Sequence, residues 1–532
     1  MKKLTVILMA LVLVLGLAQC KKNNVEEKNL VNMTLTASAN TEKVSISSHG
    51  TLKWEAGDTL NVVVNGVVRG TLCASSASLT STFTGQVNME GLTEGTEYTF
   101  YFYYIGGHGL DYGMPNTTMS ISGQSGTAGT FRNFYIASGS ATATYNAAGI
   151  EVGSTILTPY TSVVKVNRVN FCRYNETNEH FYMYGDNVYE SVEIDFSDNT
   201  FTPMNANRYI HIGNSLDRDN LYYTLLPAGN EEVTLNFVNK RTSSEIRFRN
   251  GIQSGKFYCD VNNDYAGLTV EGGSYAQGSL RGLFTVADGT LKHFSQGNLQ
   301  ATYDGNWAWA FAPRQYDAIT GHTANTSIIG IMSVSENGSV DLFGWNSTNG
   351  ISTNGINNSV TPSDYGTNTE LADWGGLIGN GWFTPNRDDW DQIFNERTVN
   401  EHRYTMVAIV KDDNSVARKG MILFPDNYSN PGVALNGAVY DAPSAFAATV
   451  HQTKEWPVLE AAGCVFLPLT CYREGTDVTQ STYGVYWSST FGTSQEMPLC
   501  WQFGTNASTP GGFLTMAAPN RYRGCAVRLM CD

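Results

Sequence analysis

Aromatic and small polar side chains are concentrated in residues 483–524, near the C-terminus of the 532-residue chain. Rigid rings supply contact area, while Ser, Thr, Asn and Gly supply adaptable hydrogen bonds, a composition typical of binding surfaces. Where these residues form strands, alternate side chains point inward, so Trp501 and Phe503 share one face and are alternatively core residues. The candidate ligand contacts are Phe491, Thr493, Gln495, Trp501, Gln502, Thr505, Asn506, Asn520 and Tyr522.

Sequence signatures of catalysis and of metal binding are missing. The eight His residues contain no i, i+3 or i, i+4 pair and no H-E-x-x-H motif. Neither G-x-S-x-G nor a phosphate-binding P-loop occurs. The carboxylates at 388, 389, 391 and 396 fall on one expected helix. We interpret them as capping and solvating that helix, in preference to forming the acid pair of a glycosidase. We therefore expect no enzymatic activity, no cofactor and no metal, and we interpret the acidic loops 217–220 and 260–264 as solvated turns.

The cysteines allow two interpretations. Besides Cys20 there are eight, and five of them lie in the last 70 residues, at 464, 471, 500, 525 and 531. Disulfides within this region would fit an oxidising compartment, although spacing does not give their connectivity. Buried free thiols are the alternative.

The first twenty residues have the pattern of an export signal. Lys2 and Lys3 precede an apolar run at 4–17, which is too short to span a bilayer as a mature helix. The run ends in Leu-Ala-Gln-Cys and resembles a bacterial lipoprotein signal, which is cleaved before the lipid-bearing Cys20. Residues 1–19 are then the signal peptide and residues 20–32 a tether. We expect the chain to lie on the cell surface, anchored in the outer membrane by acyl chains.

Composition excludes nucleic acid as a partner and divides the chain. The net charge is -15, charged residues are only 15 % of the total, and no basic run occurs. Only Trp54 precedes residue 300, whereas nine Trp residues follow it. We expect a domain boundary near the Gly- and Ser-rich residues 266–281, which we interpret as a linker to a C-terminal domain at 282–532.

The region before this linker alternates as half-buried strands do. Such runs occur at 35–38, 60–64 and 98–103, and again at 162–166, 191–196, 233–237 and 245–249. Asn65-Gly66 between two Val-rich runs predicts a tight hairpin. We expect antiparallel β-sandwiches at 33–150 and 151–265.

Particular sequences in this region resemble fimbrillin-family proteins. HGTLKWEAGDTLNVVVNG (49–66), STFTG (81–85) and YTFYFYY (98–104) are similar to the first sandwich of that family, which a Trp-x-x-Gly-Asp step opens; here the step is Trp54, Gly57 and Asp58. LTPYTSVVKVNRVNF and the segments YYTLLPAG and GIQSGKFYCDV are similar to the start and end of its second sandwich. The resemblance covers about 33–262.

The C-terminal region predicts two helices. Asn386 is a candidate N-cap with Asp389 three residues on, and Trp390, Ile393 and Phe394 then share one face. A second helix is expected at 455–462, ended by Gly463. With strands and long loops around them, these helices indicate an α+β domain.

Seven ordered segments of this region resemble the major paralogous domain of surface lipoproteins, which is similar to the C-type-lectin-like and formylglycine-generating-enzyme fold. Cys stands at 464, 471 and 525, where that family has small residues, and the calcium-dependent sugar-binding signatures are absent. The segments are LKHFSQGNLQAT, VDLFGW, WFTPNRDDWDQIFNER, GMILFPDNY, LEAAGCVFLPLTCYR, YGVYWSST and NRYRGCAVRLM.

Together these resemblances imply a mostly β surface adhesin that binds a glycan or protein on host or other cells through its lectin-like domain. In fimbrillin pili, removal of an N-terminal strand opens a groove for a strand of the next subunit. A tip subunit accepts a strand without donating one, and Lys43 is the candidate processing site because no Arg precedes Arg69. The alternatives are an oxidase of the sulfatase-maturing type on the same scaffold and a structural envelope lipoprotein.

Overall fold

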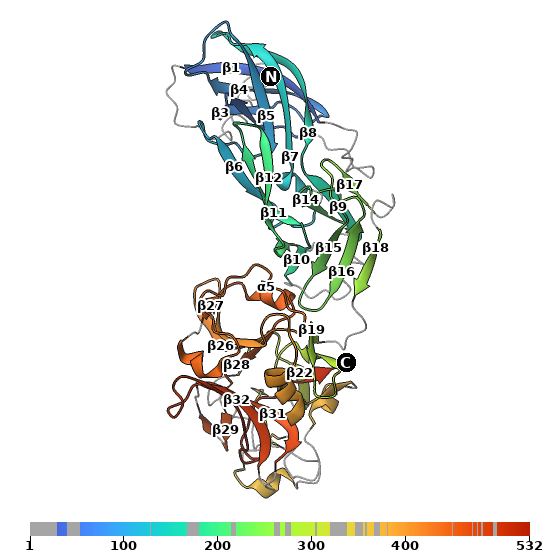
Figure 1. Cartoon of the computed structure of the whole chain (residues 1–532), viewed down its shortest axis with the longest axis vertical. Coiled ribbons are helices and arrows are strands. Elements are labelled where there is room, and N and C mark those ends of the chain that lie inside the picture. The colour runs from blue at the N-terminus through green and yellow to red at the C-terminus, as the bar shows by residue number, and fades with distance from the viewer. Residues whose placement is uncertain are drawn as a thin grey trace, which may run out of the picture. The chain divides into compact units, whose positions relative to one another are not determined.

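The computed structural model is mostly β and describes most of the chain after residue 28 (Figure 1). It divides into two compact units: unit 1 comprises described residues up to Phe237 and Ser244–Glu271, and unit 2 comprises Val238–Ser243 and described residues after 271. Among the described residues, no helix combines the length and apolar character needed to cross a bilayer. The described residues are 29–39, 54–127, 129–167, 180–213, 220–259, 266–271, 278–303, 306–319, 338–345, 355–356, 359–366, 373–379, 381–448, 451–470, 472–475, 477–479, 482–492 and 497–532.

Seven strands of unit 1 form a closed barrel in the order β1-β4-β3-β2-β5-β7-β8. The predicted hairpin is confirmed: Asn65 and Gly66, at φ 52° and 77°, turn β2 into β3 in the left-handed conformation that a two-residue turn requires. The strands are β1 (Leu30–Ala39), β2 (Thr59–Val64), β3 (Val67–Ala74), β4 (Thr80–Asn88), β5 (Glu97–Ile105), β7 (Ile136–Thr144) and β8 (Ile150–Pro159).

The barrel is closed by β1, its N-terminal strand. β1 runs antiparallel to β4 from Leu30↔Asn88 to Ser38↔Thr80 and parallel to β8 from Met33↔Ile150 to Ala39↔Leu157. Alternate side chains of β1 are buried, which fixes the register because a slip of one residue would turn them outward. Trp54 also holds β1 in place, since its indole Nε1 donates a 3.1 Å hydrogen bond to the carbonyl oxygen of Ala37. The buried side chains are Val31, Met33, Leu35 and Ala37.

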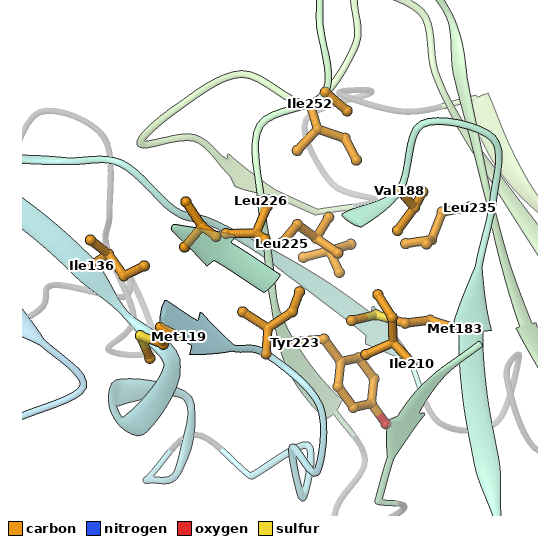
Figure 2. Close-up of a cluster of buried hydrophobic side chains, with 14 of the residues drawn as sticks. Met119, Ile136, Met183, Val188, Ile210, Tyr223, Leu225, Leu226, Leu235 and Ile252 are labelled. Atoms are coloured by element: carbon orange, nitrogen blue, oxygen red, sulfur yellow. The ribbon is translucent and has the colours of Figure 1, made fainter. Parts of the chain in front are cut away.

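The rest of unit 1 consists of three sheets around a second core. Figure 2 shows Met183, Ile210 and Leu235 meeting there, on strands distant in sequence. The sheet orders are β13-β10-β15-β16-β18, β12-β11-β6 and β14-β9-β17. The strands are β6 (Asn116–Ser120), β9 (Ser162–Asn167), β10 (Phe181–Tyr184), β11 (Tyr189–Asp195), β12 (Thr200–Ala206), β13 (Ile210–Ile212), β14 (Asn220–Leu225), β15 (Val233–Val238), β16 (Ser243–Phe248), β17 (Phe257–Tyr258) and β18 (Ala266–Glu271), with a 3-10 turn at Phe131–Phe134.

The structure differs from the division expected within this region. β8 starts at Ile150 but belongs to the barrel, while β6, which lies before residue 150, pairs with β11 of the second set of sheets. The β1–β8 and β9–β17 pairs are parallel, so the sheets are not purely antiparallel. Val63 and Ile105 of the barrel share the second core with Met183, which explains why both sets of strands form one unit. Of the expected linker, 266–271 and 279–281 are strand.

Unit 2 combines short sheets with two short helices. The sheet orders are β19-β20-β34-β24, β22-β21-β23, β27-β25-β26-β28, β29-β30 and β31-β32-β33. The strands are β19 (Ser279–Thr285), β20 (Leu291–Ser295), β21 (Leu299–Tyr303), β22 (Trp307–Phe311), β23 (Gly338–Val340), β24 (Trp382–Phe383), β25 (Tyr404–Val410), β26 (Val416–Leu423), β27 (His451–Thr453), β28 (Val465–Pro468), β29 (Tyr472–Glu474), β30 (Asp477–Thr479), β31 (Tyr483–Phe491), β32 (Pro498–Gly504), β33 (Phe513–Ala517) and β34 (Met530–Cys531). The 3-10 turns are η5 (Pro362–Tyr365), η6 (Gly375–Leu377) and η8 (Pro443–Ala448).

Both predicted helices are confirmed. α4 (Arg387–Asp391) begins with the capping box of Asn386 and Asp389 and continues as the π-helical turn η7 (Gln392–Glu396). The buried Trp390 stacks on Phe394 at 5.4 Å, as their i, i+4 spacing predicted. α5 (Trp456–Ala461) ends before Gly463, whose φ of +91° suits a residue without a side chain.

Three tryptophans of unit 2 link its core to main-chain oxygens. Trp345, Trp390 and Trp487 are fully buried. Each indole donates a hydrogen bond to a main-chain oxygen, those of Ser488, Trp487 and Phe343 respectively, at 3.1, 3.2 and 2.6 Å. A buried indole N–H usually finds such an acceptor, whereas the indole nitrogen of the buried Trp501 has no hydrogen-bond partner among the described residues.

Candidate recognition surface

The predicted contact residues are distributed over β31, β32 and the segments around them. Phe491 pairs with Pro498 at one end of the β31–β32 hairpin, whereas Tyr483 pairs with Gly504 at the other end. β32 has seven residues, so about 20 Å separates the two ends. The predicted residues therefore form two groups instead of one patch. Thr493 and Gln495 lie outside the described residues, as do Cys20 and Lys43.

Phe491 marks the first group. Its half-buried ring packs against Trp345 at 5.3 Å, and the Arg521 guanidinium carbon lies 5.3 Å from its centroid. Asn520 and Tyr522 flank Arg521 and bond each other, with Nδ2 of Asn520 donating to the Tyr522 hydroxyl at 2.8 Å. These contacts cover part of the Phe491 ring, so only the rest of the ring is accessible to a ligand.

Trp501 is a core residue, which corrects its inclusion among the candidate contacts. It is 4 % exposed and packs against Phe394 at a centroid distance of 5.0 Å, while Phe503 on the same face of β32 is fully buried. Strand alternation is the physical reason, as the second interpretation of the sequence anticipated.

Thr505 and Asn506 lie at the other end of the hairpin, where β32 turns toward β33. The Asn506 side-chain oxygen accepts hydrogen bonds from the backbone N–H groups of Ser508 and Thr509, at 2.9 and 2.8 Å, and so shapes the turn. Gln502 is half-buried, with Nε2 3.8 Å from the Cys500 sulfur. The polar side chains at this end of the hairpin therefore mainly bond within the protein instead of presenting free groups to a ligand.

A continuous row of half-exposed rings lies at this end, and we call it the aromatic row: Tyr472, Tyr483 and Phe513. The ring centroids of Tyr483 and Phe513 are 5.7 Å apart, and those of Tyr472 and Tyr483 are 6.2 Å apart. The Arg523 guanidinium carbon lies 4.3 Å from the Tyr472 centroid. Nε of Arg523 donates to a Glu474 carboxylate oxygen at 2.8 Å, which places a charged pair beside the rings.

The phenol of Tyr483 in the aromatic row is a neutral group. Burial, together with neighbouring Tyr472, raises the pKa of Tyr483 to about 12, so its hydroxyl keeps its proton at neutral pH. The surface thus offers ring faces and an Arg–Glu pair. Sequence reasoning did not find these residues, because only the register Tyr483↔Gly504↔Phe513 brings two of the rings together.

Gly504 lies between Tyr483 and Phe513 in the sheet, and its substitution by Ala is expected to destabilise unit 2 by roughly 3 kcal/mol. Its φ is +130°, and an added Cβ would lie 2.5 Å from the Thr482 oxygen and 2.7 Å from the Tyr483 Cα. Thermal unfolding of the full chain measures the effect. Gly376→Ala is the matched control, since nothing lies within 4 Å of its Cβ position. Equal unfolding midpoints of the two variants would contradict this account.

A shallow hollow of about 380 Å³ occurs elsewhere in unit 2. Its charged lining is mainly basic, with Arg314, Lys411 and Arg418 against Asp317, and Tyr316 contributes one ring. It contains none of the predicted contact residues, and we treat it as the alternative binding site to be tested against the aromatic row.

Four described cysteines of unit 2, at 464, 500, 525 and 531, are buried thiols outside any disulfide. Burial raises the pKa of Cys500 to about 12, and burial also raises the pKa values of Cys464 and Cys525 well above the ordinary range. Because thiolates are the metal-binding and nucleophilic form, these side chains are arranged as core residues. Cys471 lies outside the described residues.

Comparison with known proteins gives structural similarity alone. No family model matches the chain, and no curated protein matches its sequence. A fimbrial protein from Bacteroides ovatus ATCC 8483 is 12 % identical, with 95 % of this chain and all of that chain covered and a TM-score of 0.23. A fimbrilin from Porphyromonas gingivalis W83 is 11 % identical over 45 % of this chain and 81 % of its own, at 0.25. A candidate cell adhesion protein from Bacteroides ovatus ATCC 8483 is 14 % identical over 45 % and 95 %, at 0.29. At these values we base the function on the chain's own residues.

Proposed function

We propose that the chain is a non-enzymatic cell-surface adhesin whose unit 2, a lectin-like domain, binds a glycan through the aromatic row. The observation that carries this proposal is the row itself, with Arg523 and Glu474 beside it. A pyranose ring has an apolar C–H face that packs on aromatic planes and hydroxyl groups that bond charged side chains. Tyr and Arg supply this combination in binding surfaces. The chain's net charge of -15 favours neutral over anionic glycans.

Tyr483→Ala and Phe513→Ala are each expected to weaken glycan binding about 30-fold or more, the effect of losing a residue worth about 2 kcal/mol. A glycan array probed with the full chain first identifies ligands, and calorimetry with the strongest one then measures affinity. Tyr316→Ala is the matched control, a half-buried Tyr in the hollow.

The outcomes separate the two surfaces. Loss of affinity in Tyr316→Ala but not in the other variants would move the site to the hollow. If no glycan on the array shows saturable binding, glycan recognition is contradicted. The remaining functions are then adhesion to a protein and a structural role in the envelope.

We further propose that the adhesin is held in the outer membrane by lipid on Cys20 or, after cleavage near Lys43, accepts a strand as a pilus tip. β1 supports the second route, because it occupies a complete strand position between β4 and β8 and precedes Lys43 in the chain. Mass spectrometry of the N-terminus of surface protein distinguishes an acylated Cys20 from a start at Val44. An unmodified, uncleaved N-terminus would contradict both routes.

A further inference from the structure

Two histidines far apart in sequence meet on one face of unit 1. β10 and β13 are antiparallel with Tyr182 opposite His211, so His180 lies diagonally across from His211. Nδ1 of His180 and Nε2 of His211 are 3.3 Å apart. Phe181 and Ile210 point into the second core, which places both imidazoles on the opposite face of the sheet. We infer that His180 and His211 form a divalent transition-metal site, with Zn²⁺ as the ion that fits best.

The nitrogen–nitrogen distance supports this choice of ion. Zn²⁺ holds His nitrogens at about 2.0–2.1 Å in a tetrahedral shell, so two such ligands lie roughly 3.3–3.4 Å apart. Neighbouring ligands of an octahedral or square-planar ion with the same bond length would lie nearer, at about 2.9 Å. The observed 3.3 Å is a hydrogen-bond distance between the two rings, and it also equals one edge of a tetrahedral shell. Imidazole also suits Zn²⁺ and Cu²⁺, whereas Ca²⁺ and Mg²⁺ prefer oxygen ligands.

Aromatic packing holds one ligand in position. His211 packs edge-on against the buried Tyr182 at 5.5 Å, and Tyr182 in turn neighbours Tyr209 at 6.2 Å. Tyr209 stacks on Tyr184 at 4.2 Å. His180 is exposed, so its ring can rotate to aim its lone pair at the ion and water can complete the shell. Among the described residues no group of three or more His, Cys, Asp or Glu is placed to hold a metal.

The test is calorimetric titration of the untagged full chain with ZnCl₂ in a buffer that does not bind metal. We expect one saturable site whose affinity falls at least about tenfold in His180→Ala and again in His211→Ala. His108→Ala, which removes an exposed His of the same unit, is the matched control and keeps wild-type affinity. Circular dichroism of each variant verifies that the fold is retained.

Co²⁺ provides a second readout, because a tetrahedral Co²⁺ complex absorbs visible light strongly and an octahedral one does not. We expect the intense visible band in the wild type and its loss in both His variants. Absence of saturable Zn²⁺ binding, or equal affinities in the wild type and both variants, would overturn the site. A weak octahedral Co²⁺ spectrum would overturn its tetrahedral geometry.

Discussion

Arg397→Met is expected to lower the unfolding free energy of unit 2 by about 3–5 kcal/mol, because it breaks a buried ion pair. The Arg397 side chain is fully buried, and its Nη1 donates to Asp426 at 2.7 Å. Its other nitrogens donate to the main-chain oxygens of Ile393 and Arg403, at 2.7 and 2.9 Å. Asp426 also accepts a 2.9 Å hydrogen bond from the Thr285 backbone. One guanidinium thus links the helical segment to the residue before β25 and to Asp426, which follows β26.

Chemical denaturation followed by tryptophan fluorescence measures this loss selectively, since nine of the ten Trp residues follow residue 300. Arg387→Met is the matched control. Arg387 begins α4 but is 49 % exposed and contacts Asp388 only at 3.6 Å, so we expect a change below about 0.5 kcal/mol. Similar losses in the two variants would show that the Arg397 network contributes little.

A chain that starts at Val44, and so lacks β1, is expected to lose the folded barrel and to regain it when a peptide of residues 30–39 is added. The missing strand would leave β4 and β8 with unpaired edges and expose the pocket of Leu35, which is fully buried in the intact barrel. Trp54 reports the change, because it is the only Trp before residue 300 and bonds to Ala37 of β1. Anisotropy of a labelled peptide measures the affinity.

The control peptide carries Leu35→Asp. Burying an unpaired carboxylate is costly, so we expect its affinity to be more than about 100-fold lower. If the shortened chain folds with its barrel closed and ignores the peptide, β1 is not an exchangeable strand and the pilus-tip route fails. If both peptides bind equally, binding does not use the β1 position.

The elements of both units were largely predictable from local pattern. The strands expected at 60–64 and 98–103 correspond to β2 and β5, although every residue of β2 is buried instead of alternate ones, and Asn65-Gly66 forms the expected turn. The capping box at Asn386 specified α4 because capping, helix periodicity and burial act within a few residues. The barrel closure was not predictable. Pairing of β1 with β8 joins residues more than 100 positions apart and depends on the whole unit.

For the candidate sites too, the residue types could be predicted from the sequence, whereas their spatial proximity could not. Composition pointed to the C-terminal region, but it could not distinguish the buried Trp501 from the half-exposed Tyr483, since both are aromatic residues of adjacent strands. The search for His pairs considered helical spacing, whereas His180 and His211 are neighbours only through the register of β10 and β13. Residue types were therefore visible in the sequence, while their proximity was set by strand pairing.

The place of β1 in the barrel also sets the order in which unit 1 can fold. A chain is synthesised from its N-terminus, so β1 emerges before the other described strands of the barrel, with β4 about 50 residues later and β8 only after residue 150. Until then β1 has no partner on one side, and closing such a long loop is slow compared with forming a hairpin. β1 is thus synthesised early but completes its pairing late. During that interval a strand from another molecule can compete for the position between β4 and β8.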